Sequence, residues 1–94
     1  MKKEGIVRKR ILVFGRVQGV GFRYRASHAA KAFGLTGWVR NNPDGSVEME
    51  LQGEEELIRR MEPAMEDCSW IRIMEWKMTD LPVDEEERSF YVRG

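Results

Sequence analysis

The glycine-rich segment GRVQGVGFR, residues 15–23, limits how this chain can fold more than any other stretch. Apolar residues 11–14 precede it and a helix-like pattern follows, so it predicts a turn from a strand into a helix. Such a turn gathers backbone N–H groups at the helix N-terminus, where the helix dipole also favours anions. Glycine adopts the positive φ values that this clustering requires. The segment therefore predicts a phosphate-binding loop, although an ordinary tight turn fits these residues equally well.

The predicted loop consists of Gly15, Arg16, Val17, Gln18, Gly19, Val20 and Gly21. Arg23 lies in the first turn of the helix that follows, at the edge of its apolar stripe. From there its side chain can reach back toward the loop amides without being buried. We therefore expect Arg23 to place a planar cation at the mouth of the loop.

Length and charge restrict the kind of protein that this loop can serve. The 94 residues suit a single domain, residues 1–94, with one core and one substrate pocket. Because 41% of the residues are hydrophobic and 34% are charged, the composition indicates a soluble globular chain. The 16 basic and 16 acidic residues cancel, so no global field attracts nucleic acid or an anionic membrane. We expect anion recognition to be local, with neither nucleic acid nor membrane as a partner.

The single cysteine, Cys68, indicates a reducing compartment, because it allows neither an intramolecular disulfide nor a zinc site of several cysteines. The N-terminal run is basic, but the apolar stretch after it, residues 11–14, is too short for the core of a signal peptide. No apolar stretch reaches transmembrane length. The sequence thus predicts a cytoplasmic protein.

The predicted elements follow the order β-α-β-β-α-β, with one further strand. Strands are expected over residues 6–14, 36–42, 46–52, 70–78 and 89–93, and helices over residues 22–33 and from residue 54. Gly34 ends the first helix, and the sequence NPDG at residues 42–45 predicts a hairpin turn. Pro63 should end or kink the second helix near Glu62. This order implies an α+β fold with one sheet and both helices on one face.

Two strands carry further information. The strand at residues 70–78 lacks clean alternation, which indicates a bulge or an edge position. The strand at residues 46–52 alternates between an apolar set, Val47, Met49 and Leu51, and a polar set, Glu48, Glu50 and Gln52. We expect the polar face to be wet. The carboxylates of Glu48, Glu50 and residues 84–87 are then most simply a solvated surface.

Several familiar sites are excluded by the residues present. The loop lacks the Lys-Ser/Thr ending of a P-loop, and Tyr24 occupies the place of the third glycine in a dinucleotide fingerprint. His28, the single histidine, lies far around its helix from the apolar stripe and should face water. Cys68 has no histidine nearby in sequence, which favours a passive thiol. We therefore expect no nucleotide cofactor, no histidine-based triad and no metal site.

What remains is an anion-binding loop, one arginine and some amides, without a general base. Such a site suits an acyl phosphate, because the departing carboxylate is stable without protonation, whereas the alkoxide of a phosphate monoester is not. A water must still be oriented, and Asn41, at the end of the second strand, is the best candidate. Asn41 also reads as a turn residue leading into NPDG, and spacing alone does not choose between the two.

Three segments together resemble the acylphosphatases: GRVQGVGFR at residues 15–23, GWVRN at residues 37–41 and DGSVE at residues 44–48. The resemblance spans nearly the whole chain in length and element order. It implies a ferredoxin-like α/β sandwich, with a mostly antiparallel sheet covered on one face by two helices. It also implies hydrolysis of the carboxyl-phosphate bond to a carboxylate and inorganic phosphate, with neither metal nor cofactor.

Carried over by position, Arg23 matches the phosphate-binding arginine of the family, Asn41 its water-positioning asparagine, and residues 15–21 its loop. The departures are Pro63 and the stretch at residues 68–76, which put the geometry after the second helix in question but not the site. We therefore expect a small, monomeric, cofactor-free acylphosphatase.

Two alternatives remain. The same fold and loop could form a non-catalytic phosphate- or carboxyphosphate-binding or regulatory domain. An RNA-binding domain of the same topology would need stacking aromatics on its central strands, and residues 46–52 offer none.

Overall fold

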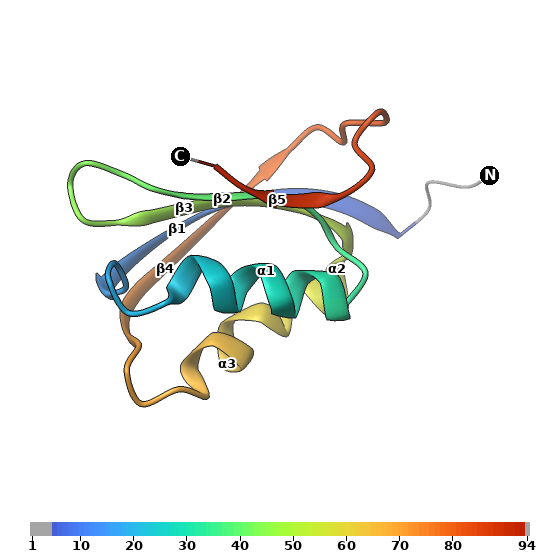
Figure 1. Cartoon of the computed structure of the whole chain (residues 1–94). Helices are drawn as coiled ribbons and strands as arrows, with labels where there is room; N and C mark the ends of the chain where they lie inside the picture. The colour runs from blue at the N-terminus through green and yellow to red at the C-terminus, as the bar shows by residue number, and fades with distance from the viewer. Residues whose placement is uncertain (1–4, 94) are drawn as a thin grey trace.

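The computed structural model describes residues 5–93, so both ends of the predicted domain, residues 1–4 and Gly94, lie outside the described residues. The chain forms β1 (Ile6–Arg16), α1 (Phe22–Ala32), β2 (Thr36–Asn41), β3 (Val47–Glu54), α2 (Glu55–Arg59), α3 (Met61–Glu66), β4 (Arg72–Leu81) and β5 (Phe90–Val92) (Figure 1). The strand order is β4-β1-β3-β2-β5, antiparallel except where β5 joins β2 in parallel. All the helices lie on one face of this sheet (Figure 1). The predicted ferredoxin-like α/β sandwich is confirmed.

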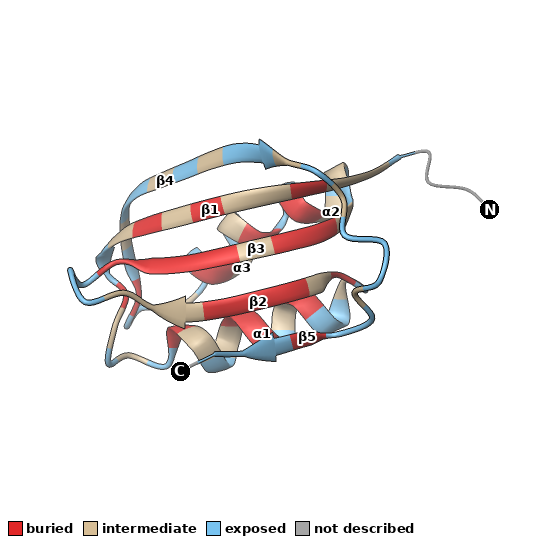
Figure 2. Ribbon diagram, turned by 90° about the horizontal axis from the view of Figure 1, so that it is seen from above, coloured by how far each residue is buried: buried red, intermediate tan, exposed pale blue. Residues whose placement is uncertain are grey.

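The core lies between the sheet and the helices. Its strand residues come mainly from one face of the inner strands and include Ile11, Val13, Val39, Val47, Met49 and Leu51. Its helix residues include Phe22, Ala26, Ala30, Ile58, Met61 and Met65. Figure 2 shows how burial concentrates on β1, β3 and β2, whereas β4 and β5 at the edges are mostly exposed. Period-2 alternation in the strands and helical spacing in α1 thus predict the core correctly.

The second predicted helix is broken earlier than expected. It ends at Arg59 with Arg60 as its C-cap, and a new helix, α3, begins at Met61 and contains Pro63. In a continuous helix the ring of Pro63 would clash with the carbonyl of Arg59, four residues back. In the first turn of α3 it needs no N–H, and its own carbonyl accepts a hydrogen bond from the Asp67 N–H at 3.1 Å. The expected kink near Glu62 is therefore a break at Arg60, followed by a restart.

Strand β4 has both features that its irregular pattern indicated. It lies at the edge of the sheet, and its pairing with β1 shifts register between Phe14 and Gly15, which leaves Met74 without a partner. A Cβ at Gly15 would lie 2.2 Å from the carbonyl oxygen of Arg72. Gly15 is therefore required by strand packing at the bulge. Strand β1 also runs two residues further than predicted, to Arg16.

The polar face of β3 is not solvated, which corrects the expectation for Glu48, Glu50 and Gln52. Glu48 is only 5% exposed, because Arg10 from β1 and Arg40 from β2 bond its carboxylate at 2.7 and 3.1 Å. Burial alone would raise the pKa of Glu48, and these hydrogen bonds hold it below its usual value. Arg40 also lies over the Trp38 ring at 5.4 Å.

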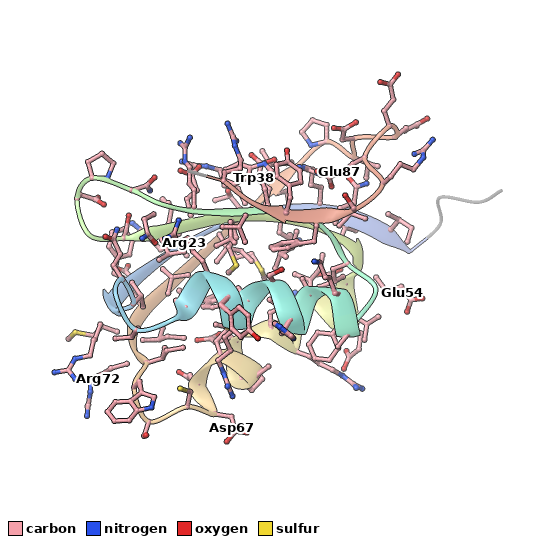
Figure 3. All side chains as sticks on the ribbon, in the orientation of Figure 1. Arg23, Trp38, Glu54, Asp67, Arg72 and Glu87 are labelled. Atoms are coloured by element: carbon pink, nitrogen blue, oxygen red, sulfur yellow. The ribbon has the colours of Figure 1, made fainter. Side chains whose placement is uncertain are left out.

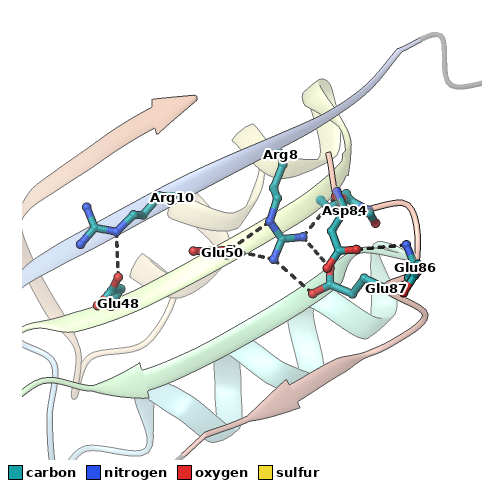
Figure 4. A network of polar contacts seen from close by, with 8 residues as sticks. Arg8, Arg10, Glu48, Glu50, Asp84, Glu86 and Glu87 are labelled. Atoms are coloured by element: carbon teal, nitrogen blue, oxygen red, sulfur yellow. Dashed lines mark hydrogen bonds and ion pairs between the residues drawn. The ribbon is translucent and has the colours of Figure 1, made fainter. Parts of the chain in front are cut away.

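The loop at residues 84–87 is likewise not a free acidic surface. It folds back over the open face of the sheet, where Arg8 bonds Glu87 at 2.7 Å, Glu50 at 2.8 Å and Gln52 at 3.1 Å (Figure 4). Gln52 in turn donates to the carbonyl of Asp84 at 2.9 Å. The guanidinium of Arg8 is 6% exposed and makes five hydrogen bonds to these side chains. Arg8, Arg10 and Arg40, on the two strands beside β3, bury the polar face of β3. The alternation of β3 alone does not reveal them.

Candidate active site

A cavity of about 390 Å³ opens at one end of the sheet, beside the start of α1. Its walls come from the loop after β1, the first turn of α1, the end of β2 and the last strand, through Val17, Gly19, Gly21, Phe22, Arg23, Tyr24, Asn41 and Val92. Figure 3 shows Arg23 at this end, between the sheet and the start of α1. The fold therefore brings Arg23 and Asn41, 18 positions apart in sequence, to one cavity.

Part of the loop lines this cavity, namely Val17, Gly19 and Gly21. Gly19 and Gly21 have φ values of +74° and +82°, in the left-handed region that other residues rarely adopt, and Gly21 caps α1. Val17 is buried and fixes the loop to the core. No main-chain N–H of residues 17–21 donates to another main-chain group within the described chain. The first amides of α1 are also free of helical partners, so the two sets form a region that favours an anion.

Arg23 is half-buried and makes neither an ion pair nor a side-chain hydrogen bond to any residue of the described chain. Five N–H donors in a planar fork are therefore available at the cavity wall. A planar fork matches two oxygens of a phosphoryl group.

Asn41 is the last residue of β2, opposite Val47 of β3. Its carboxamide oxygen is buried and has no hydrogen-bond donor among the described protein groups. An unsatisfied buried acceptor costs about 1–3 kcal/mol, so such an oxygen is unusual in a folded protein. Asn41 is also the β2 residue that lines the cavity.

The turn after Asn41 does not use the Asn41 side chain. Asn42 donates its main-chain N–H to the Ser46 carbonyl at 2.8 Å, and Asp44 accepts from the Ser46 N–H at 2.9 Å and from its hydroxyl at 2.6 Å. The hydrogen bond from the Ser46 hydroxyl lowers the pKa of Asp44. The turn signal therefore belongs to residues 42–46, which leaves Asn41 free for the cavity.

Gln18 ties the loop to this turn. Its side-chain amide donates to the carbonyl of Asn42 at 2.7 Å and to that of Ser46 at 2.8 Å. Two segments that are far apart in sequence, the loop and the residues directly after Asn41, are thereby held at a fixed separation.

Several predicted loop residues do not line the cavity, namely Gly15, Arg16, Gln18 and Val20. Gly15 serves the bulge, and Arg16 lies opposite Arg72 on β4. Three lining residues were missed by sequence reasoning: Phe22, Tyr24 and Val92. Helical phase places Phe22 and Tyr24 near the loop, but nothing in the sequence reveals that β5 pairs with β2 and so brings Val92 there.

The other candidates from the sequence lie elsewhere. His28 is exposed, as expected, and its ring lies 4.4 Å from that of Tyr24. Cys68 is partly buried against the core. Across residues 5–93 no three His, Cys, Asp or Glu side chains gather closely enough to hold a metal ion. In the same range no helix has the length and apolar character to cross a membrane.

Known proteins share this fold. A family model described as Acylphosphatase matches residues 9–92. The chain is 43% identical over 90 residues to an acylphosphatase of Bifidobacterium longum, covering 94% of this chain and 93% of that relative. The structure of an acylphosphatase from Coxiella burnetii matches with a TM-score of 0.89 at 30% identity, over 99% of this chain and 98% of that one. An acylphosphatase from Bacillus subtilis gives a TM-score of 0.86 at 32% identity, over 94% and 99%.

Proposed function

The chain belongs to the acylphosphatase family and is a hydrolase of acyl phosphates; we propose that it acts in the cavity beside α1, through Arg23, the loop amides and Asn41. The phosphoryl group lies against the free amides of residues 17–21 and the first turn of α1. Arg23 bonds two of its oxygens through its planar fork. These donors stabilise the charge on the phosphoryl oxygens in the transition state.

The buried oxygen of Asn41 is the observation that carries the mechanism. A water donates one O–H to this oxygen, which directs its lone pair toward phosphorus, in line with the departing carboxylate. A new P–O bond forms as the P–O bond to the acyl oxygen breaks. The leaving group keeps the electron pair as a carboxylate.

The proton of the attacking water needs an acceptor, and none of the side chains that line the cavity is a histidine or a carboxylate. A phosphoryl oxygen of the substrate therefore takes it. The same donor set also lacks the carboxylate, imidazole or thiolate ligands with which a protein would hold a metal ion. We accordingly propose a cofactor-independent hydrolysis.

The loop and Arg23 would suit a second function equally well, namely a domain that binds phosphate or carboxyphosphate without hydrolysing it. Asn41 distinguishes the two. An acceptor oxygen facing an anion is repulsive unless a donor such as water lies between them. A site built for binding alone would gain from a donor at this position, so the buried acceptor favours hydrolysis.

The direct test is the release of inorganic phosphate from benzoyl phosphate in the presence of a chelator. We expect catalysed release at an unchanged rate when the chelator is added. Tight binding of inorganic phosphate without any acceleration of hydrolysis would support the second function instead. Loss of activity with chelator, restored by a divalent ion, would contradict the metal-free mechanism.

We also keep the remaining expectations as proposals: a monomer, in the cytoplasm, without a nucleic-acid partner. The open face of the sheet supports the last of these, because ion pairs among Arg8, Arg10, Glu48 and Glu50 cover its middle, and Trp38 on the same face lies beneath Arg40 and Arg93 rather than free to stack on a base. Light scattering after size-exclusion chromatography tests the first.

A further inference from the structure

A second hollow of about 330 Å³ adjoins the cavity and is lined by Tyr24, Ser27, His28, Lys31 and Val92. It meets the first at Tyr24 and Val92, which line both. Helix α1 passes beneath β2 and β5, and it begins at the phosphate-binding loop (Figure 2). The two hollows therefore form one groove that leaves the loop and follows α1.

Helical spacing explains why these residues share the groove. Positions 24, 27, 28 and 31 differ by three or four, so they form a single stripe on α1. The stripe rises by about 10 Å from Tyr24 to Lys31. Side chains on a helix lean toward its N-terminus, which for α1 is the end at which the cavity lies.

The groove is apolar near the cavity and cationic at its far end. The rings of Tyr24 and His28 lie 4.4 Å apart at a tilt of 52°, and with Val92 they offer flat ring faces and one aliphatic side chain to an acyl group. Lys31 is exposed and makes no ion pair or side-chain hydrogen bond within residues 5–93. No carboxylate lines either hollow. Lys31 lies in the last turn of α1, where the helix dipole favours a cation. This interaction uses none of the three ammonium donors.

We propose that this groove is the subsite for the acyl group, and that it favours acyl phosphates carrying a second, anionic group at the end remote from the reacting carbonyl. The acyl chain lies along Tyr24 and His28, and its terminal carboxylate pairs with Lys31. The proposal rests on the proposed function, because it assumes that the phosphoryl group occupies the loop.

Two substrates that differ only at the remote end test it: benzoyl phosphate and 4-carboxybenzoyl phosphate. The para carboxylate cannot reach its own acyl carbon, so neither substrate cyclises. We expect a kcat/KM about fivefold higher for 4-carboxybenzoyl phosphate, as one partly screened ion pair provides. Lys31→Gln should reduce this ratio to about one by slowing only the carboxylated substrate, and Lys31→Arg should preserve the preference.

Lys77→Gln is the matched control, because it removes the same charge from β4, away from α1. Its ratio should equal that of the unaltered protein. Raising the salt concentration should lower the ratio for the unaltered protein by screening the pair. This measurement needs no variant to fold.

The outcomes separate the two proposals. If benzoyl phosphate is hydrolysed but the ratio is unchanged in Lys31→Gln and insensitive to salt, the acyl subsite is wrong and the proposed function stands. If neither substrate is hydrolysed faster than in buffer, both proposals fail.

Discussion

Arg8 on β1 and Arg23 on α1 carry the same guanidinium group, but the surroundings of the two groups differ. Arg8 is 6% exposed and bonds Glu50, Gln52 and Glu87 on the open face. Arg23 lines the cavity and bonds no side chain of the described chain. The contrast separates a guanidinium whose donors are all used by the protein from one whose donors stay available at a cavity.

The same contrast extends to the neutral groups. The side-chain oxygen of Gln52 on the open face accepts from Arg8 and from the Asp84 N–H, and its side-chain amide donates to the Asp84 carbonyl. Asn41 in the cavity keeps a buried oxygen without a donor. Such an oxygen costs a folded protein about 1–3 kcal/mol, and under the proposed mechanism a bound water would remove that cost. The predictions that follow each alter one side of this comparison.

The largest effect is expected from Asn41→Ala, which removes the acceptor for the attacking water. We expect kcat for benzoyl phosphate to fall roughly 1,000-fold. Competitive inhibition by inorganic phosphate should stay within about twofold, because the loop and Arg23 are intact. Stability toward urea should be unchanged or higher, since a buried unsatisfied oxygen is lost. Normal turnover in this variant would overturn the mechanism.

Removing the free guanidinium, by Arg23→Ala, should lower kcat/KM roughly 100-fold and weaken inhibition by phosphate. Arg23→Lys should recover only part of this, because an ammonium lacks the planar fork. Arg16→Ala is the control, since Arg16 belongs to the same segment but does not line the cavity. Equal losses in the two variants would mean that general positive charge, and not the position of Arg23, is responsible.

On the structural side, Arg8→Met should lower the free energy of unfolding by about 2–4 kcal/mol, because it leaves Glu50 and Glu87 without their cation. Below its melting transition the variant should retain kcat. Arg72→Met, at an exposed position on β4, should change stability by less than about 0.5 kcal/mol. Urea midpoints measure both, and similar values for the two variants would contradict the structural role.

Gln18→Leu tests the link between the loop and Asn41. It removes both donors to the Asn42 and Ser46 carbonyls at nearly constant volume. We expect kcat to fall about tenfold through misplacement of Asn41, while the phosphate inhibition constant changes by less than about twofold. A purely stabilising role would leave kcat unaltered at a temperature where the variant is folded.

The smallest effect concerns pH and Glu48. Its pKa is lower in the folded than in the unfolded chain, so its contribution to stability is present above the unfolded value and is lost as the pH falls through the folded one. Glu48→Gln should cost about 1 kcal/mol at pH 7. The free energies of unfolding of Glu48→Gln and of the unaltered protein should therefore converge as the pH falls, which urea unfolding at several pH values would measure. A difference that stays constant with pH would contradict the role of the Glu48 carboxylate.

Periodicity was enough to predict most of the fold, because each element has to bury an apolar face. Gly34 ends α1 with a φ of +73°, and the NPDG turn forms between β2 and β3 as expected. The errors have physical causes that lie across strands. Glu48 looked solvated because the arginines that bury it, Arg10 and Arg40, come from other strands. Pro63 marks a break in the helix, but the break falls at Arg60, because a proline ring clashes with the carbonyl four residues before it.

The candidate site was predictable where it depends on short segments. Arg23 and Asn41 were chosen from their segments, and the fold brings both to one cavity. The links between segments were not predictable in the same way. The bonds from Gln18 to the turn and the place of Val92 both depend on tertiary pairing, which no local pattern records.

Val92 lines both hollows, and its strand reaches them by pairing Gly37 with Phe90. Ribosomes release a chain from its N-terminus onward, so the loop, Arg23 and Asn41 emerge well before Val92. A nascent chain therefore carries every group that we assign to turnover while still lacking one wall of the cavity. Pairing between residues so far apart in sequence is also slow. The wall of the cavity at Val92 is therefore the last part of the site to form.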